Sequence, residues 1–581
     1  MADLVIRNAT IVDGTRAPSR RGDVAITGER ITEVAERVDT KGHHEVDADG
    51  LLLTPGFVDI HTHYDGQVTW DPVVAPSSLH GVTSIVMGNC GVSFAPARPT
   101  DADHDWLIGL LEGVEDIPGS ALAEGLPWDW ETLPDYLDAL GRREWTLDIG
   151  AQVAHAPLRA FVMGERGADP NEAPTADELT EMHRLTRQGI DAGALGFTTS
   201  RTYLHRTRDG NPLGTRFSTA DELTALASAL TDAGRGVIQM ISDAYQSADE
   251  GFVDEELALM RSLVQATGRR LSMTVQQPEP QPERWRKMIA WVGGCVADGL
   301  PMRAQVAPRP IGVLCGLEAS INPFMTCPSA AEVAGLAQPE RVRALADDDR
   351  RRRILKEHEV VPEGIVGEFT HGFHKLFPLT DPVDYEPPLE RSVQGLAAAS
   401  GRPPADVAYD LLLERDGQQL LYMPLMNYAA GDLSDVREML LSPHSIIGLS
   451  DGGAHCGTVC DASFPTTAVA LWGRDRTRGE RLPIELVVHH LTQRTASHVG
   501  WHDRGVIGAG YLADINLIDL DELGAHPPTL VRDLPAGGRR LMQTAAGYRA
   551  TIKRGVVTFA EGHPTGDRPG RLVRGPQTVA Q

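Results

Sequence analysis

The chain has 581 residues, a formal net charge of −26 and 59 glycines, with 41% hydrophobic and 5% aromatic residues. These values suit a folded α/β enzyme and exclude a fibrous or disordered chain, and the acidic charge argues against nucleic acid as a partner. The six cysteines are irregularly spaced, so no disulfides are expected. No apolar run approaches about 18 residues, and residues 1–10 lack a signal-like pattern. We therefore predict a cytoplasmic protein without a membrane partner.

Short strands separated by turns are predicted at both ends of the chain. Alternating apolar and polar residues occur in segments 3–11, 23–27, 30–34, 50–54, 511–520 and 550–558. We therefore expect a small β-sandwich domain built from residues 1–55 and 505–581, with a single large domain, residues 56–504, between them.

The large middle region alternates apolar segments with helical ones, which is typical of a parallel α/β fold. Thr175 and Glu178 form a capping-box pattern that predicts a helix over residues 175–191. Residues 302–435 interrupt the alternation and are interpreted as an insertion, with the charge run 347–353 on a solvated helix. A TIM-like (β/α)8 barrel is the simplest architecture. Its expected strands lie in segments 56–60, 83–87, 146–153, 194–199, 236–241, 271–275 and 445–449.

A pair of histidines follows the first of these strands. Residues 56–60 form a short apolar segment, and His61 and His63 stand two apart at its end. In an extended chain both side chains point to the same side, so both imidazoles can reach one metal ion. Imidazole is the commonest ligand for zinc and similar metals, and Asp59 and Asp65 flank the pair. We therefore predict a metal site rather than a chance pair of surface histidines.

Cys90 and Asp451 also follow predicted strands. Gly88 and Gly91 allow a sharp bend around Cys90, whose thiolate would be a strong ligand for zinc, and an inert buried cysteine is the alternative. Asp451 could bind the metal and transfer a proton, and the alternative is a turn residue that caps the next helix.

Four side chains are candidates for contacts with a substrate. His155 ends the third apolar segment, where a hydrogen-bonded structural histidine is the alternative. Arg201 and His205 follow the fourth segment; a guanidinium can bind a substrate carboxylate through two parallel hydrogen bonds, and an internal salt bridge is the alternative. His455 lies in the loop that follows Asp451.

Four ordered motifs resemble those of the amidohydrolase superfamily, and of its branch that contains the N-acyl-D-amino-acid deacylases. They are PGFVDIHTH (55–63), GVTSIVMGNCGVS (81–93), GALGFTTS (193–200) and GLSDGG (448–453). The similarity extends over residues 3–558. It implies a TIM barrel with a β-sandwich made from both termini. It also implies metal ligation by His61, His63, Cys90 and Asp451, with Asp451 handling the proton.

Two features depart from that family pattern. Many members bridge two metals with a carboxylated lysine of the fourth strand, and this chain has no lysine between Lys41 and Lys287. The deacylases also have histidine ligands on the next two strands, where this chain has Met240 and Gln276. We therefore expect one tightly bound metal ion, zinc for the mixed nitrogen, oxygen and sulfur ligands, with a second ion left open.

These features predict a metal-dependent hydrolase that cleaves a C–N amide bond in an N-acyl-amino-acid-like small molecule, with Asp451 as general acid and base. Hydrolysis of cyclic amides or imides on the same scaffold is one alternative. A non-catalytic binding or regulatory protein with a degenerate metal site is the other. The sequence leaves the exact substrate, its chirality and homo-oligomer formation open.

Overall fold

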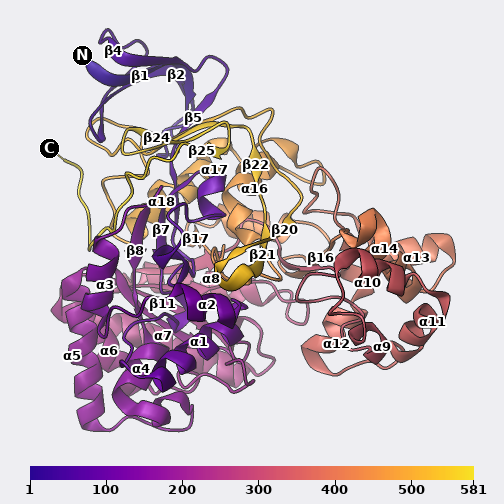
Figure 1. Cartoon of the computed structure of the whole chain (residues 1–581). Coiled ribbons are helices and arrows are strands. Elements are labelled where there is room, and N and C mark those ends of the chain that lie inside the picture. The colour runs from indigo at the N-terminus through magenta and orange to yellow at the C-terminus, as the bar shows by residue number, and fades with distance from the viewer. Residues whose placement is uncertain (581) are drawn as a thin grey trace.

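The computed structural model describes residues 1–580 of the chain and has a mixed α/β fold. Figure 1 shows three regions: strands near both termini at the top, parallel strands with their helices in the centre and below, and a helical lobe at one side. None of the helices in the described part of the chain has the length and apolar character that crossing a membrane requires.

One nine-stranded sheet combines strands from both ends of the chain. In its middle, β18 pairs antiparallel with β5 and with β23, while β5 runs parallel to β1. The apolar side chains of Ile6, Val24, Ile515 and Leu517 share one buried cluster. The limits 1–55 and 505–581 of a sandwich domain stay a prediction. The order is β25-β24-β23-β18-β5-β1-β2-β3 with β4 beside β1, and the strands are β1 Ala2–Ile11, β2 Arg20–Thr27, β3 Arg30–Ala35, β4 Gly42–Asp47, β5 Leu52–Pro55, β18 Ile515–Ile518, β23 Tyr548–Lys553, β24 Val556–Ala560 and β25 His563–Pro564.

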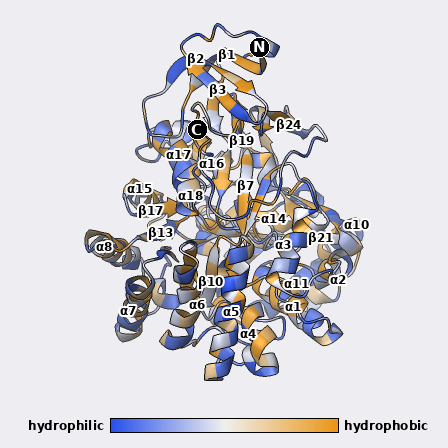
Figure 2. Ribbon diagram, turned by 90° about the vertical axis from the view of Figure 1, so that its left-hand side faces the viewer, coloured by the Kyte–Doolittle hydropathy of each residue, from blue (hydrophilic) through white to orange (hydrophobic). Residues whose placement is uncertain are grey.

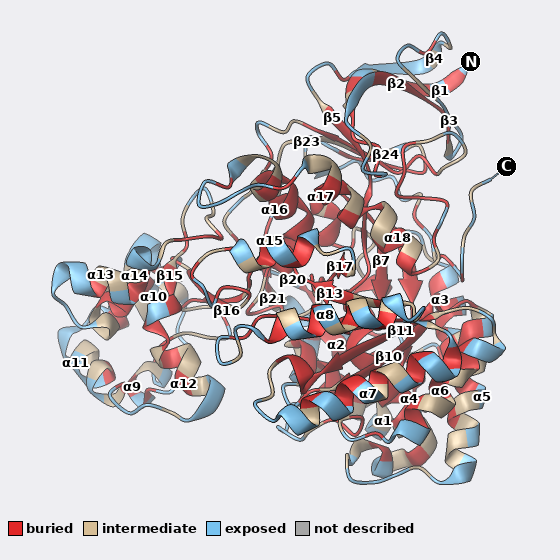
Figure 3. Cartoon of the chain, turned by 180° about the vertical axis from the view of Figure 1, so that it is seen from behind, coloured by how far each residue is buried: buried red, intermediate tan, exposed pale blue. Residues whose placement is uncertain are grey.

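The central strands are parallel and occur in two sheets, of three and six strands. Every residue of β7 and β11 is buried, as expected for parallel strands covered by helices, and Figure 3 shows the buried colour on these strands. Because the pairing divides into two sheets, it does not confirm the predicted closed (β/α)8 barrel. The sheets are β6-β7-β8 (Phe57–Asp59, Val82–Met87, Asp148–Ala151) and β17-β13-β12-β11-β10-β9 (Ser445–Ile447, Met302–Val306, Arg270–Thr274, Val237–Ser242, Gly196–Arg201, Val153–Ala154).

Helices follow most of these strands and pack against them, for example α6 on β10, α7 on β12 and α8 on β13. Figure 2 shows hydrophobic colour on β7 and mixed colours on the outer helices. The predicted capping box is confirmed: Thr175 accepts from the N–H of Glu178, whose side chain accepts from the N–H of Thr175. The helices are α1 Asp101–Glu115, α2 Gly119–Gly125, α3 Leu133–Gly141, α4 His155–Met163, α5 Ala176–Ala192, α6 Ala220–Asp232, α7 Glu250–Thr267, α8 Arg284–Ala297, α15 Ser434–Leu441, α16 Phe464–Ala470, α17 Ile484–Leu491 and α18 Gln493–His498.

The lobe is formed by residues between β13 and β17 and has its own apolar core, which includes Phe324, Ile354 and Leu412. Asp347 caps α11 by accepting from the N–H of Arg350 (2.9 Å), so the charge run lies on a helix as predicted. The lobe consists of α9 Pro328–Ala331, α10 Gln338–Leu345, α11 Asp348–Glu357, α12 Gly364–His371, α13 Val393–Ser400, α14 Pro404–Gly417 and the sheet β14-β16-β15 (Ile311–Cys315, Leu421–Met426, Phe377–Pro378). Two antiparallel pairs, β19-β22 (Gly524–Ala525, Ala545–Ala546) and β20-β21 (Thr529–Leu534, Gly538–Met542), complete the strands.

A buried ionic cluster joins the central strands to the nine-stranded sheet. Asp148 of β8 lies 2.7 Å from Arg504, 2.9 Å from Lys553 and 2.7 Å from Arg554. Lys553 is also 2.7 Å from Asp514. Asp148, Arg504 and Lys553 are almost completely excluded from solvent, and a carboxylate buried to this extent requires paired cations. The contacts fix the position of β8 relative to the strands near the C-terminus.

Candidate metal centre

His61 and His63 follow the end of β6, and this segment pairs with the segment that follows β17. The N–H of Asp451 donates to the carbonyl of His61 (3.2 Å), and the N–H of His63 donates to the carbonyl of Gly452 (2.8 Å). Thr62 and Gly452 form a parallel bridge between these two hydrogen bonds. The pairing brings Asp451 Oδ1 to 3.4 Å from His61 Nε2 and 3.5 Å from His63 Nε2. A carboxylate and two imidazoles therefore meet at the carboxyl ends of these strands.

Cys90 reaches the same place from a tight turn after β7. Gly88 (φ 80°), Cys90 (φ 53°) and Gly91 (φ 71°) all adopt left-handed backbone conformations. A Cβ atom at Gly88 would lie 2.9 Å from the carbonyl oxygen of Gln152, so a side chain does not fit there. The turn directs Cys90 Sγ toward His61, 3.3 Å from Nε2.

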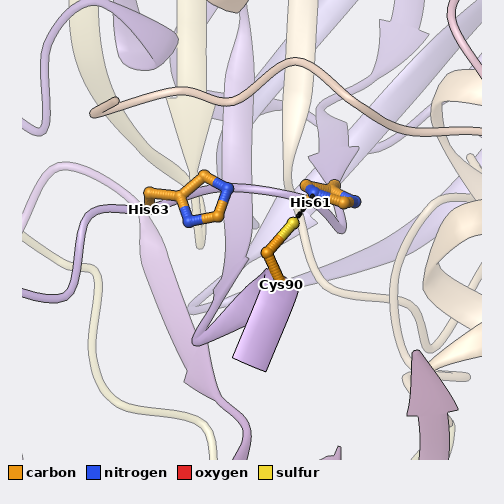
Figure 4. Close-up of side chains that lie close together, drawn as sticks. All are labelled: His61, His63 and Cys90. Atoms are coloured by element: carbon orange, nitrogen blue, oxygen red, sulfur yellow. Dashed lines mark hydrogen bonds between the residues drawn. The ribbon is translucent and has the colours of Figure 1, made fainter. Parts of the chain in front are cut away.

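His61, His63 and Cys90 form a buried group whose potential ligand atoms all lie within 4.8 Å of one another (Figure 4). None of the three is more than 5% exposed. Protein ligands about 2.0–2.3 Å from a tetrahedral zinc ion stand about 3.3–3.8 Å apart. The distances from His61 Nε2 to Cys90 Sγ (3.3 Å) and to Asp451 Oδ1 (3.4 Å) fall in this range. The residues present therefore fit a divalent cation.

Gln305 of β13 fixes the ring of His61. Its Oε1 lies 2.8 Å from His61 Nδ1, while its Nε2 donates to Ser272 Oγ of β12 at 3.0 Å. Because Oε1 is an acceptor, the proton of a neutral His61 ring lies on Nδ1. The lone pair of Nε2 then faces Cys90 and Asp451, which is the orientation that a metal-binding imidazole requires.

The carboxylates that flank the histidine pair hold the backbone. Asp59 accepts from the N–H of His61 (3.2 Å) and from the hydroxyl of Ser450. Asp65 accepts from the N–H of Gly88 (3.1 Å). These contacts tie the end of β6 to the segments that follow β17 and β7, and thereby keep the candidate ligands together.

Glu115 was not predicted from the sequence, yet it lies beside the candidate ligand His63. It is the last residue of α1 and is 2% exposed. Its Oε1 is 3.2 Å from His63 Nδ1 and its Oε2 is 3.7 Å from His455 Nε2. His63 Nδ1 and Glu115 Oε1 form an ion pair without hydrogen-bond geometry, and neither atom has a hydrogen-bond partner within residues 1–580. A carboxylate that ends a helix carries no sequence signal of the kind that marks residues after strands.

Burial and neighbouring charges shift the pKa values of this group. Burial raises the pKa of the Cys90 thiol to about 12, raises the pKa of Glu115 and lowers that of His61. For His63 burial lowers the pKa, but attraction to Glu115 and hydrogen bonding to Asp451 outweigh it and hold the pKa well above the usual value. For Asp451 burial raises the pKa, but His63 and His61 outweigh it and keep the pKa below its ordinary range. Asp451 is therefore ionised at neutral pH.

Two of the predicted substrate contacts are engaged within the protein. His155 Nδ1 lies 2.9 Å from Thr199 Oγ1 and its Nε2 lies 3.0 Å from Glu222 Oε1, so both ring nitrogens are used. Arg201 donates from Nε to both carboxylate oxygens of Glu256, at 3.0 and 2.9 Å. Each side chain thus has the internal partner that was the alternative to a substrate contact.

His205 and His455, by contrast, lie beside the candidate metal ligands. His205 Nδ1 is 2.8 Å from Ser200 Oγ, and burial together with the nearby His63 and His455 lowers its pKa to about 3. The side chain of His455 is 30% exposed and faces Glu115. A neutral imidazole at His205 can serve as a hydrogen-bonding group next to the candidate ligands.

The structure also shows the surroundings of Met240 and Gln276, which occupy the positions of the two histidines in the deacylase pattern. Met240 is fully buried in the apolar core. Its neighbour Gln239 points the other way, and its Oε1 accepts from the N–H of Cys90 (3.0 Å), because side chains alternate along a strand. Gln276 follows β12 and is 9% exposed. The residue of β11 that reaches the site is thus Gln239, which holds the Cys90 turn.

A parallel-stranded α/β fold with histidines, a cysteine and an aspartate gathered at strand ends is the arrangement of a metal-dependent hydrolase. The chain matches the model of the amidohydrolase family over residues 44–559. It therefore belongs to the amidohydrolase family.

The chain is similar over nearly its whole length to proteins named as deacylases or aminoacylases. A D-aminoacylase from Alcaligenes xylosoxydans xylosoxydans is 26% identical over 576 residues, which cover 98% of this chain and 97% of that protein. An N-acyl-D-glutamate deacylase from the same organism is 27% identical over 586 residues, which cover 100% and 98%. The solved structure of an N-acyl-D-glutamate deacylase from Bordetella bronchiseptica, complexed with zinc and a phosphonate inhibitor, has a TM-score of 0.65 at 22% identity and covers 99% of both chains. That last similarity shows a shared fold.

Proposed function

We propose that the protein is a metal-dependent hydrolase that cleaves the amide C–N bond of an N-acyl-amino-acid-like small molecule. One observation carries the proposal: Asp451 lies 3.4 and 3.5 Å from the imidazoles of His61 and His63, which are clustered with the thiol of Cys90. Membership of the amidohydrolase family supports the same reaction class.

The two parallel sheets are, in this proposal, parts of one (β/α)8 barrel. Only Gln152 separates β8 from β9, and its N–H donates to the carbonyl of Met87 in β7 (3.1 Å). At the other edge, the bridge between Thr62 and Gly452 joins the segments after β6 and β17. With these two joints the strands run in the cyclic order β6-β7-β8/β9-β10-β11-β12-β13-β17. The metal cluster then lies at the carboxyl ends of barrel strands, where TIM-barrel enzymes have their active sites.

His61, His63, Cys90 and Asp451 would hold the cation, and zinc suits this mixture of nitrogen, sulfur and oxygen ligands. When bound, a divalent cation polarises the scissile carbonyl and lowers the pKa of a water molecule. One cation per chain is favoured. The chain has no lysine between Lys41 and Lys287, so this region cannot supply a bridging carbamate for a second cation. The raised pKa of Cys90 means that the thiol must lose a proton when it becomes a ligand, so metal affinity rises with pH.

Asp451 carries the proton in this reaction. Its pKa lies below the usual range, so the carboxylate is ionised at neutral pH and can accept a proton from water. The same group then donates that proton to the amine that leaves. With His155 and Arg201 engaged by internal partners, His205 and His455 remain the proposed substrate contacts. The names of the relatives suggest N-acyl-D-amino acids as the first compounds to test.

The experiment is a substrate panel on the purified, zinc-loaded full chain. N-acetyl-D- and N-acetyl-L-amino acids, including glutamate, are compared with hydantoins and cyclic imides, and metal content is measured on the same preparation. Turnover of an acyclic N-acyl compound with one zinc per chain is the expected result. Turnover of cyclic compounds alone would establish the alternative hydrolase, and bound zinc with no turnover of any compound would favour the non-catalytic alternative.

Two variants connect the activity to the site. His61→Ala should abolish both zinc retention and turnover, because it removes one of only four candidate ligands. Asp451→Asn should lower kcat by about 10²–10⁴-fold, the usual contribution of a general acid or base. His183→Ala is the control, since this histidine lies on α5 and pairs only with Asp232 at the surface. Unchanged activity in either of the first two variants would contradict the assignment.

A further inference from the structure

A polar cavity lies at the end of the central strands opposite the metal cluster. Arg270 is the first residue of β12 and Arg303 is the second residue of β13, whereas the metal cluster follows the last residues of β6 and β7. Because the strands are parallel, the arginines lie toward the amino ends of the strands and the metal cluster lies at their carboxyl ends. We call this cavity the arginine cavity; its volume is about 400 Å³, and its charged and titratable lining consists of Arg16, Arg270, Arg303, Arg494, His489 and His498.

The four arginines have no acidic partner in the part of the chain that the structure describes. Arg270 donates to the carbonyls of Ser497 and His498 (2.6 and 3.1 Å), Arg303 donates to the carbonyl of Met302 (2.9 Å), and Arg494 donates to a carbonyl as well. No Asp or Glu lines the cavity. The chain has 80 acidic residues and a net charge of −26, so four unpaired guanidiniums in one cavity are an exception to its overall charge.

His498 provides an independent indication of a ligand. It is 7% exposed, lines the cavity, and its Nε2 has no hydrogen-bond partner among residues 1–580. Burial lowers its pKa to about 3, and Arg270 and Arg303 contribute to the shift, so the ring is neutral and one of its nitrogens can carry a proton for an acceptor. An unpaired buried polar atom costs free energy, which a bound anion would offset.

Repulsion among the arginines is a further indication of a bound anion. Burial lowers the pKa of Arg494 to about 10, and the neighbouring Arg303 and Arg16 add to this effect. Burial likewise lowers the pKa of Arg303, with a contribution from Arg270. Like charges held close together without a counterion destabilise the folded chain.

We propose that the arginine cavity binds a small multivalent anion of the phosphate class, either inorganic phosphate or a phosphomonoester, away from the catalytic centre. Guanidinium groups bind phosphate oxygens through paired hydrogen bonds, and four of them match a multivalent anion better than the single carboxylate of an amino acid. The cavity has room for a small molecule. The surrounding negative charge disfavours a nucleic-acid strand.

The test measures phosphate binding to the zinc-loaded full chain by calorimetry and by thermal unfolding. Inorganic phosphate should bind saturably at one site and raise the Tm with its concentration, whereas sodium chloride at the same ionic strength should not. Arg494→Gln and Arg270→Gln should each weaken the binding roughly tenfold or more, since charge-assisted hydrogen bonds are lost. Arg481→Gln, an exposed arginine outside the cavity, is the matched control and should bind like the original chain.

A second measurement distinguishes a loss of phosphate binding from a folding defect. Without phosphate at low salt, Arg494→Gln should unfold at the same or a higher temperature than the original chain, because one repelling charge is gone. Phosphate bound at the metal would be equally tight in all variants. That result, or a Tm rise that chloride reproduces, would mean an adventitious ion only and would overturn the proposal. Glycerol phosphate distinguishes the ligand sources: tighter binding than inorganic phosphate identifies an organic phosphate, and equal or weaker binding identifies the free ion.

Discussion

Gln305 Oε1 lies 2.8 Å from Nδ1 of His61, although the two residues are 244 positions apart in the chain. This contact determines which nitrogen of His61 carries the proton and therefore which one faces Cys90 and Asp451. A mid-strand amide of β13 thus sets the orientation of a candidate metal ligand at the end of β6.

We expect Gln305→Leu to reduce zinc affinity about 10–100-fold, the usual effect of removing a group that orients a metal ligand. The leucine cannot accept from Nδ1–H, so the His61 ring loses its fixed tautomer. Competition with a chelator measures the affinity. Gln305→Glu keeps an acceptor at the same place and should stay much closer to the original value. Equal affinities for the leucine variant and the original chain would show that the contact is not needed.

Cys90→Ser should weaken zinc binding at least tenfold, because a hydroxyl is a much poorer ligand for zinc than a thiolate. Equilibrium dialysis followed by elemental analysis gives the affinity. Cys315→Ser is the matched control, since Cys315 is equally buried but lies in the lobe. If Cys90→Ser binds zinc as Cys315→Ser does, then Cys90 is only a packing residue.

Glu115→Gln tests the carboxylate that was not predicted from the sequence. The amide has almost the same volume, so the fold should be retained, while the negative charge beside His63 and His455 disappears. We expect kcat/KM to fall about 10–100-fold with an unchanged circular dichroism spectrum. Glu112→Gln, one turn earlier in α1 and more exposed, should retain full activity. Full activity in both variants would remove Glu115 from the site.

His155→Gln should separate a structural role from a substrate contact. The ring joins Thr199 to Glu222, so its replacement leaves buried polar atoms unpaired and should lower the free energy of unfolding by about 1–3 kcal/mol. Zinc content and KM should not change. Urea unfolding and steady-state kinetics on the same preparation decide between the two roles, because a raised KM at normal stability would identify a substrate contact.

Asp148→Asn should lower the free energy of unfolding by about 3–5 kcal/mol at pH 7, because it removes the buried carboxylate that three cations share. Burial raises the pKa of Asp148, but Lys553, Arg504 and Arg554 outweigh it and hold the pKa below its ordinary value. The stabilisation is therefore fully present above about pH 5 and is lost as the pH falls toward the folded-state pKa.

Urea unfolding at pH 7 and at pH 4 checks both parts of this prediction. The original chain should lose stability between the two pH values, and Asp148→Asn should lose less. The exposed pair of Asp49 with Arg21 supplies the control, since Asp49→Asn should cost no more than about 1 kcal/mol. An equal pH dependence in Asp148→Asn and in the original chain would show that this carboxylate does not set it.

Much of the site could be predicted from the sequence because its chemistry is local. His61, His63, Cys90 and Asp451 each stand just after an apolar strand, and side-chain alternation, glycines and turn residues are visible without a structure. Glu115 could not be found in this way, because it ends a helix and its proximity to His63 arises only from the packing of α1.

The partners of His155 and Arg201 could not be predicted from the sequence either. His155 and Arg201 were correctly placed near strand ends, but the carboxylates that engage them, Glu222 and Glu256, lie on helices α6 and α7. Helix packing alone decides whether such a side chain faces a substrate or another residue. The contact between the segments that follow β6 and β17 was equally hidden, since the hydrogen bond of Ser450 with His61 spans 389 positions of the chain.

The ionic cluster around Asp148 has a consequence for how the protein is made. Its partners Arg504 and Arg554 are translated 356 and 406 residues later. At a synthesis rate of about 5–20 residues per second, β8 leaves the ribosome roughly 20–80 s before its last cation. A buried carboxylate without those cations is strongly unfavourable, so β8 cannot take its final place while translation is still in progress. The central strands can therefore complete their packing only after residue 554 has emerged.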